Sequence, residues 1–376
     1  MANVIPDGNY GACVVVPCIN ASRAHEGTMT ITANQERTKT HGEITVVTSP
    51  SCPVCGATGK SLYRGLQDWQ CGIPGNWALS HCKCGVIWLN PRPADEDIPL
   101  LYSHYYTHRG AAPPGRLERM RHEISQCELA RLGYKVERSR KLVPRLLARL
   151  PSVARGRSLE VLALAASEAG SLLDVGCGNG HFLKRMQTLG WRVSGVEPDP
   201  AAVAYAASQG LQVFKGTIRD VPINARYDVI TLSHVIEHVS DPVNLLRQCR
   251  ERLRQNAGRI VVTTPNCKSL GSRWFGRHWR GLEIPRHLNI FSTESLRACV
   301  SRAGLRVDFI STEVRMARMI HNTSAYARRG ERSVSEQTPF DTRTKVAGYL
   351  FRALEGALIR FKKDLGEELF CKAGTE

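Results

Sequence analysis

The chain has 376 residues, 42% of them hydrophobic and 23% charged, so it exceeds one average domain and can bury a sizeable core. Lys and Arg (51) outnumber Asp and Glu (34), and the net charge of +17 favours an anionic partner such as nucleic acid, a phosphorylated substrate or an acidic membrane face. No apolar run approaches the ~18 residues that a transmembrane helix needs. Thirteen cysteines, an odd number, without a signal-peptide pattern argue against a secreted disulfide framework, and we expect a cytoplasmic protein.

Two segments flank a cysteine cluster. Residues 1–48 are rich in Thr, Asn, Gly and Ala without sustained periodicity, so we expect them to be mostly disordered. Residues 106–165 are expected to form a basic helical linker. Apolar positions at helical spacing over residues 116–150 predict one or two amphipathic helices, broken near Pro144.

The cysteine cluster lies in residues 49–105, which we expect to form a small zinc-ribbon-like domain. Its candidate metal ligands are Cys52, Cys55, His81, Cys82 and Cys84. Two knuckles with this spacing supply four soft ligands for one structural zinc. The fourth ligand stays open, because regular Cys-x-x-Cys spacing would pair His81 with Cys84 and leave Cys82 spare. We slightly favour His81.

From residue 171 onwards, short apolar runs alternate with helical segments, which predicts a parallel sheet covered on both faces. Five strands are expected at 171–175, 192–196, 211–214, 227–232 and 259–264, with helices at 180–189, 199–209 and 241–255. A sixth strand at 305–310, a helix at 344–363 and a seventh strand at 368–372 should follow. The predicted fold class is therefore α/β, a Rossmann-like, doubly wound sheet of seven strands, with a core at 166–313 completed by residues 314–376.

A glycine-rich turn follows the first of these strands. It runs Asp174-Val-Gly176-Cys-Gly178-Asn-Gly180 and opens a predicted helix. Glycines allow a tight turn and let backbone N–H groups approach a ligand at the start of a helix. The next strand ends in Glu197, where an acidic side chain can bind both hydroxyls of a ribose. The pattern predicts a nucleotide-type cofactor.

Three motifs, at residues 174–180, 196–200 and 227–239, together resemble the class I S-adenosylmethionine-dependent methyltransferases over about residues 170–313. The resemblance implies S-adenosyl-L-methionine as cofactor. The implied cofactor-binding residues are Asp174, Gly176, Gly178, Gly180, Glu197, Thr217, Ile218, Ser233 and His234.

The same resemblance implies the role of each position. Asp174 would order the glycine loop and face the methionine ammonium, and Glu197 would bind the ribose. Thr217 and Ile218 would border the adenine, although Thr217 stands where that family commonly has Asp. Ser233 and His234 would close over the methionine end.

The sequence His234-x-x-Glu237-His238 has two other interpretations. It matches the inverted zinc-peptidase motif, but that chemistry needs a continuous helix, whereas this segment follows a predicted strand. The segment also resembles the Glu-x-x-Glu-His sequence of ubiquinone-type O-methyltransferases, a group that the resemblance links with a divalent metal. His234 replaces the first Glu here, which places that metal in question.

The order of segments adds a second resemblance. A cysteine ribbon, the sequence Gly-Val-Ile-Trp-Leu-Asn-Pro-Arg-Pro at 85–93, Tyr105 and Tyr106, and then the core resemble the zinc-ribbon methyltransferases of sugar and surface-glycan pathways over about residues 50–313. In that group the ribbon is structural and helps to frame the substrate, so the zinc would take no part in methyl transfer.

The acceptor is expected beyond the fifth strand, at the open end of the sheet. His287 is the natural general base there, because a neutral imidazole can accept a proton as the methyl is attacked; pinning the loop is the alternative role. Related sugar C-methyltransferases have Tyr-x-Glu-His, whereas this chain has Ile-Pro-Arg-His at 284–287, so O-methylation fits better. Four arginines would suit an anionic acceptor: Arg273, Arg277, Arg280 and Arg286.

We therefore expect an S-adenosylmethionine-dependent O-methyltransferase acting on a small molecule or on a nucleotide- or lipid-linked sugar, with His287 and His234 as candidate catalytic residues. The alternatives are an RNA or protein methyltransferase, suggested by the charge and the ribbon, and a non-catalytic scaffold. No RNA-binding motif is recognised. The helix at 344–363 permits peripheral contact with a membrane.

Overall fold

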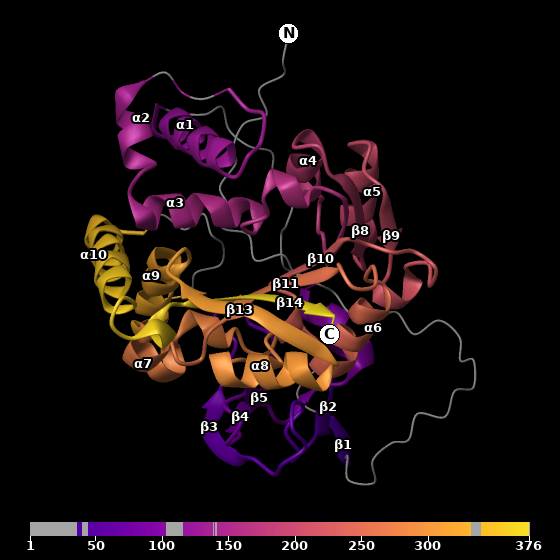
Figure 1. The fold of residues 1–376 in the computed structure, drawn as a ribbon. Coiled ribbons are helices and arrows are strands. Elements are labelled where there is room, and N and C mark those ends of the chain that lie inside the picture. The colour runs from indigo at the N-terminus through magenta and orange to yellow at the C-terminus, as the bar shows by residue number, and fades with distance from the viewer. Residues whose placement is uncertain are drawn as a thin grey trace.

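A computed structural model describes residues 36–39, 44–102, 116–137, 139, 141–331 and 340–375. Its centre is a seven-stranded sheet in the order β13-β14-β11-β10-β7-β8-β9 (Figure 1). The strands are β7 (Ser171–Val175), β8 (Arg192–Glu197), β9 (Val213–Lys215), β10 (Val229–Ser233), β11 (Arg259–Pro265), β13 (Leu305–Glu313) and β14 (Glu368–Thr375). Only β14 runs against its neighbours in this sheet. The predicted seven-stranded α/β fold is confirmed.

Both faces of the sheet are apolar, since successive side chains of a strand point to opposite faces. In β10, Ile230 and Leu232 belong to one buried cluster and Val229 to the cluster across the sheet. Side chains of α6 (Pro242–Glu251) and α8 (Thr293–Arg302) complete the first cluster. Those of α4 (His181–Thr188) and α5 (Pro200–Ser208) contribute to the second. The predicted doubly wound arrangement is therefore present.

Two of these helices begin at Asp-Pro pairs. The Asp199 carboxylate accepts the N–H of Ala201, and the Asp241 carboxylate accepts the N–H of Asn244. The proline that follows each cap is the first residue of its helix, where a missing N–H costs no hydrogen bond. The turns after β8 and β10 are therefore fixed by local sequence.

The cysteine-bearing segment forms a four-stranded sheet in the order β12-β5-β4-β3. Its strands are β3 (Lys60–Leu66), β4 (Trp77–His81), β5 (Ile87–Leu89) and β12 (Asn289–Ile290). The last of them belongs to the α/β segment and pairs antiparallel with β5. Cys52, Cys82 and Trp88 share a buried cluster with side chains of β7 and β10. The ribbon is thus joined to the core both by backbone pairing and by apolar packing.

Part of the segment expected to be mostly disordered is ordered. β1 (Glu36–Lys39) pairs with β2 (Thr45–Thr48), and β2 pairs with β6 (Arg92–Pro93). The expectation is wrong for these strands, which are too short to show a period in the sequence; residues 1–35 and 40–43 lie outside the described residues. Ile44 and Val46 are buried in the cluster that contains β4.

The predicted basic linker contains three helices, α1 (Arg116–Arg131), α2 (Leu142–Leu147) and α3 (Pro151–Ser158). The predicted break near Pro144 is misplaced: the chain leaves the helical conformation after α1, and Pro144 lies inside the first turn of α2, where proline is tolerated. Tyr134, just past α1, accepts the Trp191 indole N–H at 3.0 Å and donates to Leu164 O, which ties this segment to the core.

The C-terminal segment contributes α9 (Ala317–Arg328), α10 (Thr342–Leu358) and β14. α10 packs on α9 at the margin of the sheet (Figure 1). In the chain, the short helix α7 (Leu270–Phe275) follows β11 and precedes the loop at residues 276–291 that carries His287, called the acceptor loop below. Among the described residues, no helix combines the length and the apolar character needed to cross a bilayer.

Two carboxyl groups are buried together where α10 meets the start of β14. Glu367 accepts hydrogen bonds from Ser269 Oγ, Gly271 N and the Trp279 indole. Both carboxyl oxygens of Glu355 are buried, and neither has a hydrogen-bond partner among the described residues. Burial raises the pKa of Glu355 above its ordinary 4.5, and the nearby Glu367 raises it further. Glu355 is therefore neutral at acidic pH and costly to ionise.

This carboxyl predicts a pH-dependent stability. The pKa of Glu355 is higher in the folded than in the unfolded protein. The stability that its neutral form contributes is therefore fully present below the unfolded pKa of about 4.5 and is lost as pH rises through the folded pKa. Glu355→Gln should therefore raise the free energy of unfolding at pH 8 by about 1–3 kcal/mol, with a smaller gain at pH 5. Urea unfolding of both proteins at the two pH values measures the difference; an equal effect at both would contradict it.

Candidate active site

The glycine-rich loop connects the carboxyl end of β7 to α4. Gly176, Gly178 and Gly180 have φ angles of 70°, 53° and 79°, a conformation that strains any residue with a Cβ. The Gly176 N–H donates to Val196 O at 2.8 Å and pins the loop to β8. The three glycines are required by the backbone of this turn.

Two buried carboxyl groups border the loop. Glu197, at the end of β8, accepts the N–H groups of Gly178 (2.9 Å) and Asp199 (3.0 Å), and Asp174 accepts the Thr231 hydroxyl at 2.6 Å. Burial raises the pKa of each to about 7, against the opposing effect of these hydrogen bonds. A ligand that brings hydroxyl donors to Glu197 and an ammonium group to Asp174 would favour the ionised forms.

The segment expected to border the adenine turns sharply after β9. Thr217 caps the short helix η4 (Ile218–Asp220), and its N–H donates to the Asp220 carboxylate at 2.7 Å. The Ile218 side chain is buried in the core. Both residues lie at the same edge of the sheet as Glu197, and the acidic side chain of this turn is Asp220, three residues after the position where the family commonly has one.

His234 follows β10 with a positive φ of 56° and is held between two carboxylates. Its Nδ1 lies 3.1 Å from Glu237 Oε1 and its Nε2 lies 2.8 Å from Glu368 Oε1. Burial would lower the pKa of His234, but these two bonds outweigh it and raise the pKa to about 9. The two carboxylates therefore favour the protonated form of His234. Ser233, its neighbour, bonds Thr263 Oγ1 at 3.0 Å.

Three further groups converge just beyond His234. Ligand atoms of Glu237, His238 and His287 lie within 4.8 Å of one another, and all three side chains are buried. His287 Nδ1 donates to Gly281 O at 2.8 Å, which leaves its Nε2 as the acceptor. The Nε2 atoms of His238 and His287 are both buried without a hydrogen-bond partner among the described residues.

The protonation states of these groups decide which of them can accept a hydrogen bond. Burial lowers the pKa of His287 to about 4, although Glu283 and Glu237 oppose that shift. Glu237 is an anion, since its bond to His234 outweighs the effect of burial and lowers its pKa. Glu237 accepts the Thr264 hydroxyl at 2.9 Å as well as its bond from His234, whereas the Nε2 atoms of the two imidazoles lack a partner among the described residues. These two nitrogens favour a proton, a hydroxyl group or a cation beside them.

The loop that carries His287 is bonded to the segment that carries Glu237. Leu288 N donates to Glu237 O at 2.8 Å, and Asn289 Nδ2 donates to Val239 O at 2.6 Å. Glu237 and His238 lie in the short helix η5 (Ile236–His238), directly after β10. His287 is therefore held at the carboxyl edge of the sheet, as predicted from the sequence.

Arg286 does not face an acceptor. Its guanidinium is buried and forms two bonds to the Asp68 carboxylate, at 2.8 and 3.1 Å, and it also contacts Glu283. Arg280 is buried against the same Glu283. The expectation that these two arginines bind an anionic acceptor is therefore wrong, because their charges are already neutralised inside the protein.

The other two arginines of that set lie at the surface. Arg273 Nε donates to Lys268 O, and Arg277 donates to the carbonyls of Arg64 and Gly65. Neither contacts a carboxylate among the described residues, so these two remain candidates for an anionic group.

Three residues that shape this site were not predicted from the sequence. Asp68 and Glu283 fix the acceptor loop, and Tyr102 places its hydroxyl 3.0 Å from His238 Nδ1, which also lies 3.1 Å from Arg286 O. Asp68 is 218 residues from Arg286 in the chain, so no local pattern links them. The tyrosines singled out from the sequence, Tyr105 and Tyr106, lie outside the described residues.

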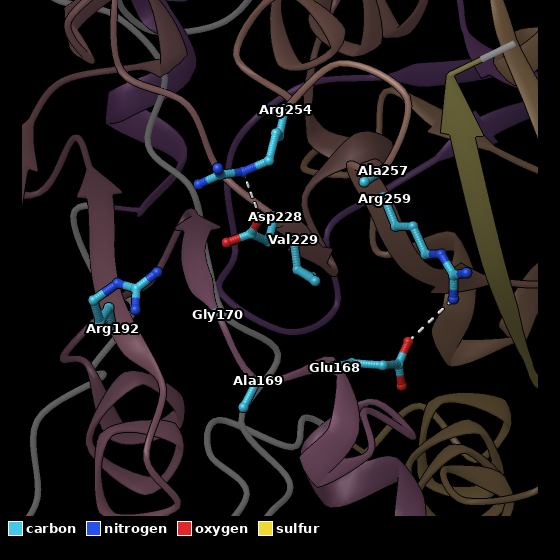
Figure 2. A pocket seen from close by; sticks show the side chains of 9 residues that line it. All are labelled: Glu168, Ala169, Gly170, Arg192, Asp228, Val229, Arg254, Ala257 and Arg259. Carbon is cyan, nitrogen blue, oxygen red and sulfur yellow. Dashed lines mark hydrogen bonds and ion pairs between the residues drawn. The ribbon is translucent and has the colours of Figure 1, made fainter.

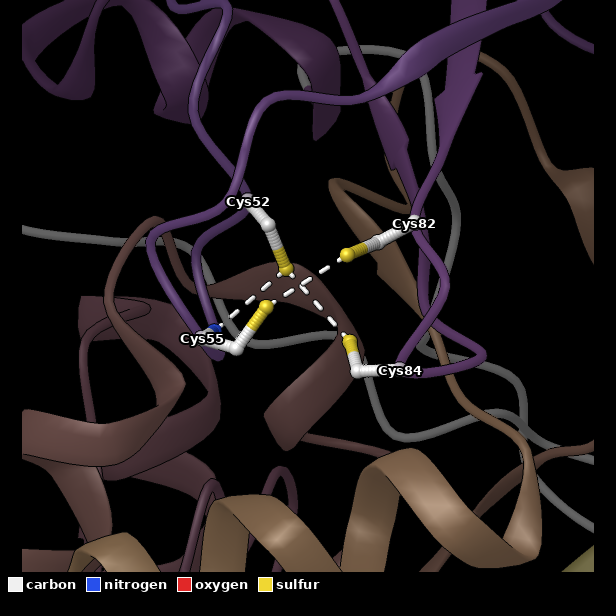
Figure 3. A group of neighbouring side chains, drawn as sticks. All are labelled: Cys52, Cys55, Cys82 and Cys84. Carbon is white, nitrogen blue, oxygen red and sulfur yellow. Dashed lines mark hydrogen bonds between the residues drawn. The ribbon is translucent and has the colours of Figure 1, made fainter.

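The four cysteines come together at the base of the ribbon (Figure 3). The Sγ atoms of Cys52 and Cys84 are 3.6 Å apart, those of Cys55 and Cys82 are 3.4 Å apart, and all four lie within 4.8 Å of one another. Four thiols at this separation fit the tetrahedral ligand set of a structural zinc. His81 is not in the group; it ends β4, so the slight preference for it is wrong, and Cys82 completes the cluster.

One hollow of about 410 Å³ lies at the opposite edge of the sheet (Figure 2). It is bordered by Gly170, Arg192, Asp228 and Arg259, which stand at the amino ends of β7, β8, β10 and β11. Arg254 pairs with Asp228 at 2.6 Å, and Arg259 pairs with Glu168 at 3.2 Å. Cofactor-binding groups gather at the carboxyl ends of such strands, so this hollow is separate from the candidate site.

One substitution tests the close packing behind the glycine loop. A Cβ on Gly195, in β8, would lie 2.5 Å from Cys177 Sγ and 2.7 Å from Leu183 Cδ1. Gly195→Ala should displace the loop and weaken S-adenosylmethionine binding about tenfold or more in calorimetry, as small misplacements at binding sites commonly do. Gly356→Ala is the matched control, because its Cβ would meet nothing within 4 Å. Equal affinity of both variants would contradict the assignment.

Comparisons with known proteins agree with this geometry. Residues 136–308 match the family model of a methyltransferase domain. A ubiquinone biosynthesis O-methyltransferase of Cereibacter sphaeroides is 32% identical over 146 residues, 36% of this chain and 59% of that protein. A probable S-adenosylmethionine-dependent methyltransferase of Mycobacterium tuberculosis is 32% identical over 101 residues, 26% of this chain and 36% of that protein.

A solved S-adenosylmethionine-dependent methyltransferase from Archaeoglobus fulgidus, 20% identical, aligns with a TM-score of 0.37 over 55% of this chain and 86% of that one. The chain spans little more than half the length of the first curated relative. The family match covers the strands that carry the glycine loop, Glu197 and the convergent groups after β10. Residues 136–308 are therefore similar to methyltransferase domains.

Proposed function

We propose that this chain transfers the methyl group of S-adenosylmethionine to a hydroxyl oxygen of a small-molecule acceptor, with His287 accepting the proton. The observation that carries the proposal is the convergence of Glu237, His238 and His287 at the carboxyl edge of the sheet, where the Nε2 atoms of both histidines lack a hydrogen-bond partner among the described residues. The similarity of the matched segment to ubiquinone biosynthesis O-methyltransferases supports oxygen as the methylated atom.

The reaction asks for alignment and the removal of one proton. The sulfonium of the cofactor is already a strong electrophile, so the protein has to hold the acceptor oxygen in line with the methyl group. As the oxygen forms its bond to carbon, the carbon–sulfur bond breaks and the hydroxyl proton passes to His287 Nε2. The carboxylate of Glu283, 3.3 Å from that nitrogen, stabilises the imidazolium that results.

His287 is suited to this role in protonation and tautomer. Its pKa of about 4 keeps the imidazole neutral near pH 7, and the bond to Gly281 O keeps the proton on Nδ1. Because Nε2 is buried, an acceptor can reach it only when neighbouring groups move aside, a gating step that many enzymes use.

A second candidate for proton removal follows from the same donor set. Glu237, His238 and His287 offer one carboxylate and two imidazole nitrogens, and the Nδ1 atom of each histidine lies against a backbone carbonyl, the usual outer contact of a metal-bound histidine. A divalent cation held there would lower the pKa of an acceptor hydroxyl. Zinc in the cysteine cluster is proposed to be structural, since all four ligand positions are taken by thiolates.

The acceptor proposed is a hydroxylated small molecule or a sugar linked to a nucleotide or lipid. The ribbon forms a wall beside the acceptor loop through the pairing of β5 with β12. The exposed Arg273 and Arg277 are the remaining arginines of that loop for a phosphate or carboxylate on the acceptor.

His287→Ala tests the role of this residue. With tritium-labelled S-adenosylmethionine and a panel of phenols and sugar nucleotides, the parent should label an oxygen, and the variant should lose about 100-fold or more of the rate. Cofactor affinity should stay within about twofold, because His287 lies outside the cofactor loop. Full turnover by the variant, or label found on carbon or nitrogen, would contradict the proposal.

Metal analysis of the same samples separates the two candidates. A general base predicts one zinc per chain in both proteins, as the four cysteine ligands require, and activity that survives dialysis against EDTA. A catalytic cation predicts a second metal that is lost in the variant and whose removal abolishes turnover.

A further inference from the structure

α10 carries an exposed apolar stripe. Leu350 is 66% exposed, Phe361, just past the helix, is 90% exposed, and the same stripe contains Val346 and Leu354. These positions recur every three to four residues when Ala357 is included, so they lie on one side of the helix. Large apolar side chains exposed in a row, rather than singly, mark an interaction surface.

The inner side of α10 is already occupied. Phe351 is buried and contacts the rings of Phe275 and His321, and Gly348 lies against Asn322 of α9. Packing against α9 therefore fixes the helix on the protein body, and the stripe stays outside.

The exposed charges between residues 342 and 363 are all basic, and the acidic residues Asp341 and Asp364 stand at the two ends of this segment. The exposed ionisable residues between 342 and 363 are Arg343, Lys345, Arg360, Lys362 and Lys363. None of these five pairs with a carboxylate in the part of the chain that the structure describes. The single acidic residue of the segment, Glu355, is buried. An apolar stripe flanked by an excess of cations is the pattern of helices that lie on acidic bilayers.

A second patch of exposed apolar side chains beside basic residues lies on α2. Leu142, Val143, Leu146 and Leu150 are between 49% and 68% exposed, and the segment 141–150 contains three basic residues and no acidic one. α2 and α10 stand along one margin of the molecule, with α3 between them (Figure 1). Gly156 of α3 lies close to the Arg352 guanidinium of α10, which links the two parts of this margin.

We propose that the basic apolar face, defined as Val346, Leu350, Leu354 and Phe361 with their flanking Lys and Arg residues, docks on an anionic membrane surface. Charge complementarity selects this occupant. A second copy of the chain would set cations against cations, and a nucleic acid would leave the aliphatic stripe in water. Lipid headgroups meet the cations while the acyl boundary covers the stripe.

Co-flotation of the full-length protein with vesicles tests the proposal. Vesicles of phosphatidylcholine with 30% phosphatidylglycerol should retain the protein at low salt, with binding falling as salt screens the charges, and pure phosphatidylcholine should retain little. The triple variant Leu350→Ser, Leu354→Ser, Phe361→Ser should bind about tenfold less or weaker still. Lys362→Glu with Lys363→Glu should do the same. Ile223→Ser, which is 65% exposed elsewhere, is the matched control and should bind normally.

Unfolding temperature and S-adenosylmethionine affinity of each variant show that the fold is intact, which the exposure of the substituted side chains predicts. Three results would overturn the proposal: no retention on anionic vesicles, equal retention of the triple variant and the parent, or equal retention on neutral vesicles. If single-stranded RNA releases the protein from the vesicles and the triple variant binds as the parent does, the basic residues would be assigned to nucleic-acid binding instead. No methyl acceptor is needed, so these outcomes are independent of the proposed reaction.

Discussion

The buried pair of Asp68 and Arg286 is the contact on which the acceptor side of the structure depends. It joins the ribbon to the loop that carries His287, and Glu283 and Arg280 extend it inside the protein. A buried carboxylate or guanidinium is costly unless it is paired, so the loss of one partner would leave the other unsatisfied. The pair therefore fixes the position of the loop relative to the ribbon, because the Arg286 guanidinium can be buried only when the ribbon supplies Asp68.

This contact divides the candidate active site into two halves of different origin. The cofactor half is built from local sequence, because the glycine loop, Glu197 and Asp174 all lie at the ends of neighbouring strands. The acceptor half is built from distant segments: a tyrosine before α1, the turn after β10 and a loop that adds β12 to the ribbon sheet. A zinc ion held by the four cysteines, as proposed above, would stabilise the strands that receive β12, so it would affect acceptor binding without taking part in methyl transfer.

The sequence allowed prediction of what is local. The seven strands follow from apolar runs bounded by turns, and the glycine loop follows from spacing that only a tight turn requires. The position of His287 was predictable because it lies in the loop after the fifth strand, and its role as base stays a prediction. Arg286 was misassigned because its partner is 218 residues away. The two carboxylates that flank His234 could not be foreseen, because one of them comes from the distant strand β14. The choice between His81 and Cys82 as the fourth ligand depended on the conformation of the turn after β4, which the spacing of the residues does not determine.

The most direct test of this account is hydrogen exchange of Asp68→Asn, which keeps the size of the side chain and removes its charge. The account predicts faster exchange in peptides that span residues 276–291 and an unchanged affinity for S-adenosylmethionine, since the cofactor half does not use Asp68. Unchanged exchange in that loop would contradict the claim that the ribbon holds the acceptor half in place.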